Sequence, residues 1–285
     1  MGMTSKSILS QMRGFTLIEI SIVLVVIGLL LSGGLVALAP VIENAKRTES
    51  KNQLTKIEDA LLLWVIQSNG CLPCPADGTL TGASANNGLG LVNAGTQQTG
   101  PTCPADGSAC DIQPIAINHA GAVNTNYAGV TPWRTLGLSE ADTIDGWGNR
   151  IAYAVSDTLL IDLTGGGEEP LERQAGTPPT FGVGALTVTD TAAANITTTA
   201  AYVLVSRGSD GAFGFKISGP GTGGAKEDGL GTAGGIQGDN ADADDIYVQG
   251  DPIDINGAGY FDDIVQWKTG PVITFQCGSG ACGNP

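Results

Sequence analysis

The sequence predicts an α+β protein in which a long N-terminal helix precedes a β-rich head. Between Phe15 and Ala39 the only ionisable side chain is Glu19, so this stretch is almost wholly apolar. Apolar residues then recur at steps of three and four up to Val65, which is the spacing of one helical face. Beyond Gly70, short β-prone runs lie between Gly, Asp and Pro clusters. The predicted parts are a leader at 1–14, an apolar helix at 15–39, its amphipathic continuation at 40–68 and a head at 69–285.

The first 14 residues read as a short polar leader that does not enter the fold. They contain Lys6 and Arg13 and no acidic residue, which is typical of the positive region before an apolar export segment. An ordinary secretory signal is the alternative, because Ala37-Leu38-Ala39 offers a small-x-small cleavage site. Pro40 follows directly and should hinder that cleavage. Such signals also have a shorter apolar region, of about 7 to 15 residues.

The apolar segment at 15–39 is long enough to cross a bilayer, since about 20 apolar residues span the hydrocarbon core as a helix. A carboxylate inside such a segment costs on the order of 3 kcal/mol unless it finds a partner. Glu19 is therefore predicted to be functional, and the alternative is an interfacial acid near a helix end.

The helix is expected to continue to about Ser68. Asn69-Gly70 supplies a stop signal of the kind that ends helices in a left-handed residue. Pro40 and three glycines within the helix are weak points, because Pro removes a backbone donor and Gly costs about 1 kcal/mol per site. The predicted buried stripe of the second half consists of Leu54, Ile57, Leu61, Trp64 and Val65.

Five short runs in the head are β-prone and are expected to form an antiparallel sheet packed on the second half of the helix. The runs are Ile151–Val155, Thr158–Ile161, Ala185–Val188, Tyr202–Val205 and Val272–Phe275.

The residues Gly14-Phe15-Thr16-Leu17-Ile18-Glu19 resemble the prepilin cleavage and methylation motif of type IV pilins and type II secretion pseudopilins. The resemblance implies that a prepilin peptidase cuts after Gly14 and methylates the new amino group of Phe15. It also implies that Glu19 meets the terminal ammonium of a neighbouring subunit, so that each charge offsets the desolvation of the other. The implied fold is the pilin-like α+β architecture.

The composition agrees with an exported chain that does not bind nucleic acid. The 285 residues carry a net charge of −15, and without the two basic residues of the leader the net charge is −17. A nucleic-acid groove would need a basic footprint, which an acidic chain with 13 Lys and Arg does not suggest. Six cysteines, an even number, fit disulfides in an oxidising compartment.

The first cysteines form Cys71-x-x-Cys74, and the sequence after Cys74 is echoed after Cys103. Redox or metal chemistry is the alternative to structural disulfides here. Pro75 excludes the haem-attachment pattern, however, and no nearby His completes a zinc site. We expect Cys277 to pair with Cys282. The other four cysteines are expected to pair among themselves in an order that the sequence leaves open. They are Cys71, Cys74, Cys103 and Cys110.

Two segments ahead of the expected sheet, Thr131–Leu138 and Asp145–Arg150, resemble the stretch that leads into the sheet of major pseudopilins. Their Trp133 and Trp147 have large apolar faces, so a core role is favoured over ligand stacking.

Val205–Gly211 and Tyr260–Trp267 look like the two ends of the calcium loop of major pseudopilins, separated by a longer insertion. Residues 226–263 hold ten acids against one lysine, and calcium prefers six to eight oxygen ligands. The candidate calcium ligands are Asp210, Asp262 and Asp263. A second acidic cluster either binds an ion or keeps a Gly-rich loop solvated; it comprises Asp239, Asp242, Asp244 and Asp245.

No enzyme motif is present: the sequence has no Gly-x-Ser-x-Gly elbow, no phosphate-binding loop and no His-Glu-x-x-His pair. Its only histidine is His119. We therefore expect no catalytic residue and no organic cofactor. Calcium, considered above, is the one cofactor expected.

The sequence thus predicts a structural subunit of a type IV pilus-like filament, either a type IV pilin or a type II secretion pseudopilin. Its expected partners are further copies, other pilin-like subunits, a prepilin peptidase and an inner-membrane assembly platform. It would reside in the bacterial inner membrane before assembly and in a periplasmic or extracellular filament afterwards. The alternative is a membrane-tethered extracytoplasmic binding module, or an adhesive minor pilin that does not form the main filament.

Overall fold

The computed structural model describes residues 15–36, 38–68, 70–80, 84–92, 96–101, 110, 127–159, 183–217, 235–241, 245–253 and 258–277. The chain divides into two compact units, Met1–Ala45 and Lys46–Pro285. Helix α2, Leu38–Gln67, begins in the first unit and continues in the second.

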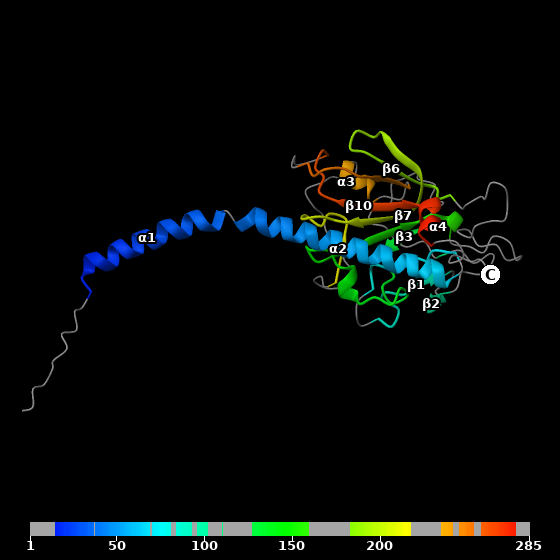
Figure 1. Cartoon of the computed structure of the whole chain (residues 1–285), viewed down its shortest axis with the longest axis horizontal. Coiled ribbons are helices and arrows are strands. Elements are labelled where there is room, and N and C mark those ends of the chain that lie inside the picture. Colours follow the sequence, from blue (N-terminus) through cyan, green and yellow to red (C-terminus); the bar gives the residue numbers. More distant parts are fainter. Residues whose placement is uncertain are drawn as a thin grey trace, which may run out of the picture. The chain divides into compact units, whose positions relative to one another are not determined.

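The first unit contains helix α1, Leu17–Val36 (Figure 1). Pro40 lies within α2 as described, so the chain is helical at the proline that the sequence marks as a weak point. In the described part of the chain, no helix has both the length and the apolar character needed to cross a membrane.

The second unit is built on a six-stranded sheet in the order β3-β5-β7-β6-β9, with β10 also paired to β7. Strand β7 is twelve residues long and pairs with three others, so it is the centre of the sheet (Figure 1). The strands are β3 Tyr127–Val130, β5 Ala152–Val155, β6 Leu186–Thr189, β7 Asn195–Ser206, β9 Ile246–Val248 and β10 Ile264–Thr269.

The expectation of a purely antiparallel sheet is wrong for one pair, since β6 and β9 run parallel. Antiparallel neighbours can be joined by a tight turn, whereas parallel neighbours need a long connection. Strand β9 follows β6 only after β7 and a long further stretch of chain, which permits the parallel pairing.

Two small ladders and several short helices complete the described elements. The ladders join β1 Gly90–Val92 to β2 Thr96–Gln98, and β4 Asn149–Arg150 to β8 Phe215–Lys216. The short helices are η1 Glu140–Thr143, η2 Asp157–Leu159, α3 Ile236–Asp239 and α4 Gly270–Cys277.

The main core lies between α2 and one face of the sheet, as the helical stripe predicts. All five stripe residues are at most 3 % exposed, and Leu54, Ile57, Leu61 and Val65 share a core cluster with Tyr202 and Leu204 of β7. The intervening Val203 and Val205 lie in a second cluster. Because successive side chains of a strand point to opposite faces, β7 contributes to an apolar layer on each side of the sheet.

Helix α2 ends at Gln67, next to the expected end at Ser68. The backbone N–H of Gly70 donates to the carbonyl of Val65 over 2.9 Å, and Gly70 has φ +113°. Few residues other than glycine adopt such a conformation readily, so the stop signal has the physical role expected of it.

One of the five predicted strands, Val272–Phe275, is helical instead, and so is the described half of the predicted strand Thr158–Ile161. Asp157–Leu159 form η2, where the Thr158 hydroxyl donates to the carbonyl of Val183, while residues 160–161 lie outside the described residues. Val272–Phe275 fall within α4, which Gly270-Pro271 begins and whose Ile273 enters the main core. A run of four residues with three apolar side chains fits a buried strand or a buried helical turn equally well, so packing decides between them.

The two tryptophans expected in the core are only half-buried. The Arg134 guanidinium lies 5.9 Å from the centre of the Trp133 ring, and that of Arg47 lies 5.8 Å from the Trp147 ring. Each indole therefore has one face available for a cation–π contact instead of being enclosed by apolar side chains.

Candidate assembly segment and acidic cluster

The first candidate site is the apolar surface of α1. Phe15 is 78 % exposed and Leu17 is 91 % exposed, and apolar side chains continue to be exposed through Leu29. A contiguous apolar surface of this extent is rare on a soluble monomer and marks a site of association with protein or lipid.

The polar residues at the start of α1 fix its first turn. The backbone N–H of Glu19 contacts both the carbonyl oxygen of Thr16 at 3.1 Å and its hydroxyl oxygen at 3.3 Å. Thr16 thus occupies the N-cap position, a role that the sequence analysis missed although Thr16-x-x-Glu19 is a capping-box pattern. Glu19 is exposed in this first turn, where the helix dipole favours a negative charge. Gly14 lies outside the described residues.

The loop Asp145–Arg150 joins α2 to the centre of the sheet. The backbone N–H of Gly146 donates to the Ser50 hydroxyl of α2 over 2.9 Å, and a Cβ at Gly146 would lie 2.3 Å from the carbonyl oxygen of Lys46. Only glycine allows this approach. Asp145 is buried and accepts a hydrogen bond from Ser206 of β7, and burial raises the pKa of its carboxyl group.

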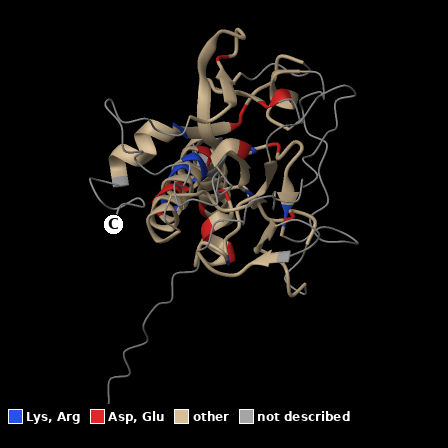
Figure 2. Ribbon diagram, turned by 90° about the vertical axis from the view of Figure 1, so that its right-hand side faces the viewer, with Lys and Arg blue, Asp and Glu red and all other residues tan. Residues whose placement is uncertain are grey.

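A buried acid on α2, Glu58, ties the helix to the sheet. Its carboxylate accepts hydrogen bonds from the Tyr202 hydroxyl at 3.1 Å and the Gln266 amide at 2.6 Å, and Lys268 Nζ lies 3.3 Å away. The sequence analysis did not identify Glu58. Gln266 and Lys268 lie two residues apart in β10 and so point to the same face of the strand, which is the sequence signal that polar side chains face this helix. Acidic residues occur throughout the ribbon, while Lys and Arg are fewer (Figure 2).

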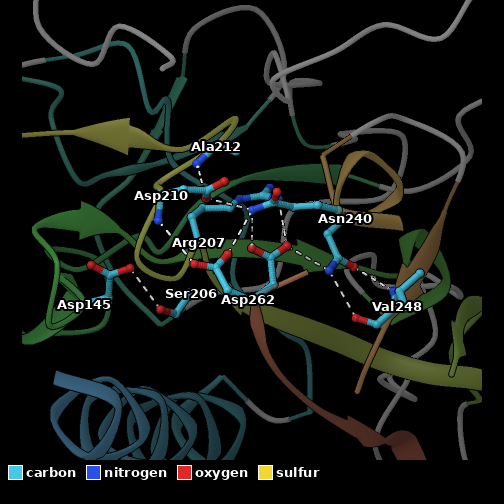
Figure 3. A network of polar contacts seen from close by, with 10 residues as sticks. Asp145, Ser206, Arg207, Asp210, Ala212, Asn240, Val248 and Asp262 are labelled. Carbon is cyan, nitrogen blue, oxygen red and sulfur yellow. Dashed lines mark hydrogen bonds and ion pairs between the residues drawn. The ribbon is translucent and has the colours of Figure 1, made fainter. Parts of the chain in front are cut away.

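The three candidate calcium ligands come together around one atom, the amide nitrogen of Gln237 in α3. Figure 3 shows two of them, Asp210 and Asp262, in the same polar network as Arg207 and Asn240. Gln237 Nε2 lies 2.9 Å from Asp210 Oδ1, 3.1 Å from Asp262 Oδ1 and 3.5 Å from Asp263 Oδ1. The structure therefore joins the two ends of the loop singled out in the sequence and adds Gln237, which the sequence analysis missed. A single glutamine between Ile236 and Gly238 carries no sequence signal for this role.

The loop at 207–211 encloses the other oxygen of Asp262. Asp262 Oδ2 accepts hydrogen bonds from the Ser209 hydroxyl, the Tyr260 hydroxyl and the backbone N–H groups of Ser209 and Asp210. Gly208 has φ +62°, and a Cβ there would lie 2.4 Å from the Asp262 carboxyl carbon. The close approach of backbone to carboxylate thus requires glycine.

Arg207 and Asn240 surround the third carboxylate. Asp263 Oδ2 lies 2.9 Å from Asn240 Nδ2 and 3.7 Å from Arg207 Nη1, and both Arg207 and Asp263 are at most 3 % exposed. Burial raises the pKa of Asp263 to about 7, although the Arg207 charge opposes this shift. Burial also raises the pKa of Asp262. The cluster therefore contains two buried acids, Asp262 and Asp263, beside the half-buried Asp210, and Arg207 supplies less positive charge than the three acids supply negative charge when ionised.

The point where the three Oδ1 atoms converge is filled by the Gln237 amide. Among the described residues, no group of three or more His, Cys, Asp or Glu side chains is arranged to hold a metal ion. Asp239 and Asp245 of the second acidic cluster belong to the described residues, while Asp242 and Asp244 lie outside them.

A disulfide joins Cys74 to Cys110, with Cα atoms 5.5 Å apart, and Cys71 is disulfide-bonded too. The first bond is one of the pairings that the sequence left open within the group of four. Cys103 and Cys282 lie outside the described residues, as does the side chain of Cys277.

Residues 9–35 match the family model of the prokaryotic N-terminal methylation motif. No curated protein and no solved structure matches the chain. The match extends over α1 up to its last residue but one, and it includes Thr16, which caps the helix, and Glu19 in the first turn. The motif implies processing by a prepilin peptidase and assembly with other pilin subunits, and it supports the resemblance of the chain to type IV pilins and pseudopilins.

Proposed function

We propose that this chain is a non-enzymatic structural subunit of a type IV pilus-like filament. The observation that carries the proposal is the methylation motif at the start of a helix whose apolar side chains are exposed. Exposed apolar surface needs an apolar environment, which lipid supplies before assembly and neighbouring helices supply afterwards. The subunit is thus held in the inner membrane by residues 15–39, meets the assembly platform there, and leaves it for the filament.

Glu19 provides the polar element of this association. After cleavage behind Gly14, the methylated amino group of Phe15 is a cation at the end of an apolar helix. Each of the two charges is costly in an apolar environment, and pairing Glu19 with the Phe15 ammonium of a neighbour offsets both costs. A contact of one subunit surface with a different surface of the next does not close on itself, so it generates a helical filament.

Within this class we favour a secretion pseudopilin with a calcium site at Asp210, Asp262 and Asp263. Carboxylate oxygens are the ligands that calcium prefers, and three of them already converge within 3.5 Å of one atom. When ionised, the three aspartates and Arg207 carry a net charge of −2, which a divalent cation would neutralise. Calcium at this point requires the Gln237 amide nitrogen to leave it, and it requires the carboxylates to move inward by roughly half an ångström to one ångström, because calcium–oxygen distances are about 2.3–2.6 Å.

The filament proposal is tested by Glu19→Ala, with Glu43→Ala as control because Glu43 is the other described acid of the first unit. We expect Glu19→Ala to leave the protein in the membrane but to reduce its amount in sheared filaments at least tenfold, since unpaired charge costs about 3 kcal/mol there. N-terminal sequencing should find methylated Phe15 in the wild-type protein. Normal filament yield with Glu19→Ala, or an uncleaved leader in filaments, would contradict the proposal.

A further inference from the structure

Strand β10 forms an open edge of the main sheet. Strand β7 pairs with β5 and with β10 over the same residues, 202–205, so these two neighbours lie on opposite sides of β7 (Figure 1). Within the described part of the chain, no other strand pairs with β10, and no backbone or side-chain group bonds the outward N–H and C=O groups of the strand. These groups are therefore available to water or to another chain.

The edge lacks the features that commonly keep such a strand from pairing. Between Ile264 and Lys268 the ladder to β7 is regular, and the strand contains no proline. Its one charged residue, Lys268, is engaged by Glu58 of α2 at 3.3 Å. Natural proteins block exposed edges with free charges, prolines or bulges, so this edge is able to accept a further strand.

A cavity of about 480 Å³ adjoins the first residues of β10, and both faces of the sheet contribute to its lining. Lys51 comes from α2, which packs on the face to which Gln266 points. Gln249 comes from the opposite face, where it accepts a hydrogen bond from Trp267. Because β7 occupies the inner side of β10, a cavity shared by both faces lies at the outer side. A chain added along the edge would therefore run into it.

The α2 wall of this cavity is positively charged. Arg47 and Lys51 are about one helical turn apart, and both line the cavity. The Lys51 side chain is exposed and has no ion pair with any described residue. Two acids also line the cavity, but Asp263 already faces Arg207 at 3.7 Å, and Asp251 belongs to the opposite wall with Gln249. A carboxylate is the group that fits beside the two cations.

We propose that the outer edge of β10 and this cavity form a docking site for an extended peptide segment of another protein, with an acidic residue at its end. The segment adds to the sheet as a further strand, and its carboxylate enters the cavity beside Arg47 and Lys51. Main-chain hydrogen bonds supply affinity, and the two cations select the acidic end. The site goes beyond the filament proposal, because it lies in the second unit and uses neither α1 nor Glu19.

The test uses three short synthetic peptides and the full-length, detergent-solubilised protein. The first peptide alternates Thr and Val between terminal Glu residues, the second adds N-methyl groups to its inner nitrogens, and the third has Gln in place of Glu. We expect calorimetry to show at least about tenfold tighter binding of the first peptide than of the second, because N-methylation removes the donors of strand pairing. The preference over the third peptide should be about three- to fivefold, as for an exposed charge pair. Amide hydrogen exchange within Ile264–Thr269 should slow when the first peptide binds.

Lys51→Ala and Lys56→Ala form a matched pair, since each removes one lysine from α2. Lys56 contacts Asp142 at 2.6 Å and does not line the cavity. We expect Lys51→Ala to weaken binding of the acidic peptide at least about threefold, and Lys51→Arg and Lys56→Ala to leave it unchanged. The inference would be overturned if none of the peptides binds, if the N-methylated peptide binds equally well, if exchange in β10 does not slow, or if Lys56→Ala has the same effect as Lys51→Ala. The filament proposal, tested by Glu19→Ala, would stand in each case.

Discussion

Removing the buried carboxylate of α2 should destabilise the second unit strongly. In Glu58→Ala the Tyr202 hydroxyl and the Gln266 amide lose their acceptor, and Lys268 loses its nearest acid. Glu58 is 6 % exposed, so water cannot replace the lost contacts without entering the interface between helix and sheet. Removing one partner of a buried charge pair lowers the free energy of unfolding by about 3–5 kcal/mol. In a unit of this size, 1 kcal/mol shifts the melting temperature by about 2–4 °C, which predicts a decrease of roughly 6–20 °C.

The assay is thermal unfolding of the detergent-solubilised chain, followed by circular dichroism. Glu58→Gln should lose less stability than Glu58→Ala, because its amide oxygen still accepts from Tyr202. Glu49→Ala is the matched control: Glu49 is an exposed acid of the same helix whose carboxylate bonds Gln53, and its removal should cost at most about 0.5 kcal/mol. If Glu58→Ala melts within about 1 °C of Glu49→Ala, the carboxylate does not hold the interface.

Two further outcomes are expected. Gly146→Ala should destabilise the protein by about 1–3 kcal/mol in urea unfolding, because its Cβ would meet the Lys46 carbonyl, whereas Gly100→Ala, with no atom within 4 Å of the added Cβ, should be near neutral. With chelator present, the free energy of unfolding should fall as pH rises from 5 to 8. The folded state raises the pKa of Asp263 to about 7 and so binds a proton that the unfolded state releases at lower pH. An Asp263→Asn variant whose stability falls equally steeply over that range would refute this assignment.

The long helix, its buried face and three strands of the sheet were predictable because each depends on residues that are close together in the sequence. The apolar residues from Leu54 to Val65 recur at helical spacing and so form one face of the helix, and this face is buried where the helix packs on the sheet. Asn69-Gly70 marked the end of the helix because few residues besides glycine adopt the required backbone conformation. Strands β5, β6 and β7 overlap the predicted β-prone runs, because short β-prone runs between Gly, Asp and Pro clusters are a local signal for strands.

The short apolar runs were not predictable in this way. Val272–Phe275 has the composition of a strand, yet it forms α4 because burial of Ile273 in the main core is compatible with helix. The parallel pairing of β9 depends on where a long connection returns to the sheet, and no local pattern encodes that.

The sequence by itself carries the signal on which the filament proposal rests. The predicted cut behind Gly14, the predicted new terminus at Phe15 and the acid Glu19 lie within six consecutive residues, so a peptidase can recognise them without any tertiary structure. The sequence also selected Asp210, Asp262 and Asp263, but only the tertiary structure decided that they meet, and that Gln237 stands between them. Contacts between residues 25 to 53 positions apart depend on the closure of long loops onto β7 and β10, which is set by packing of the whole unit.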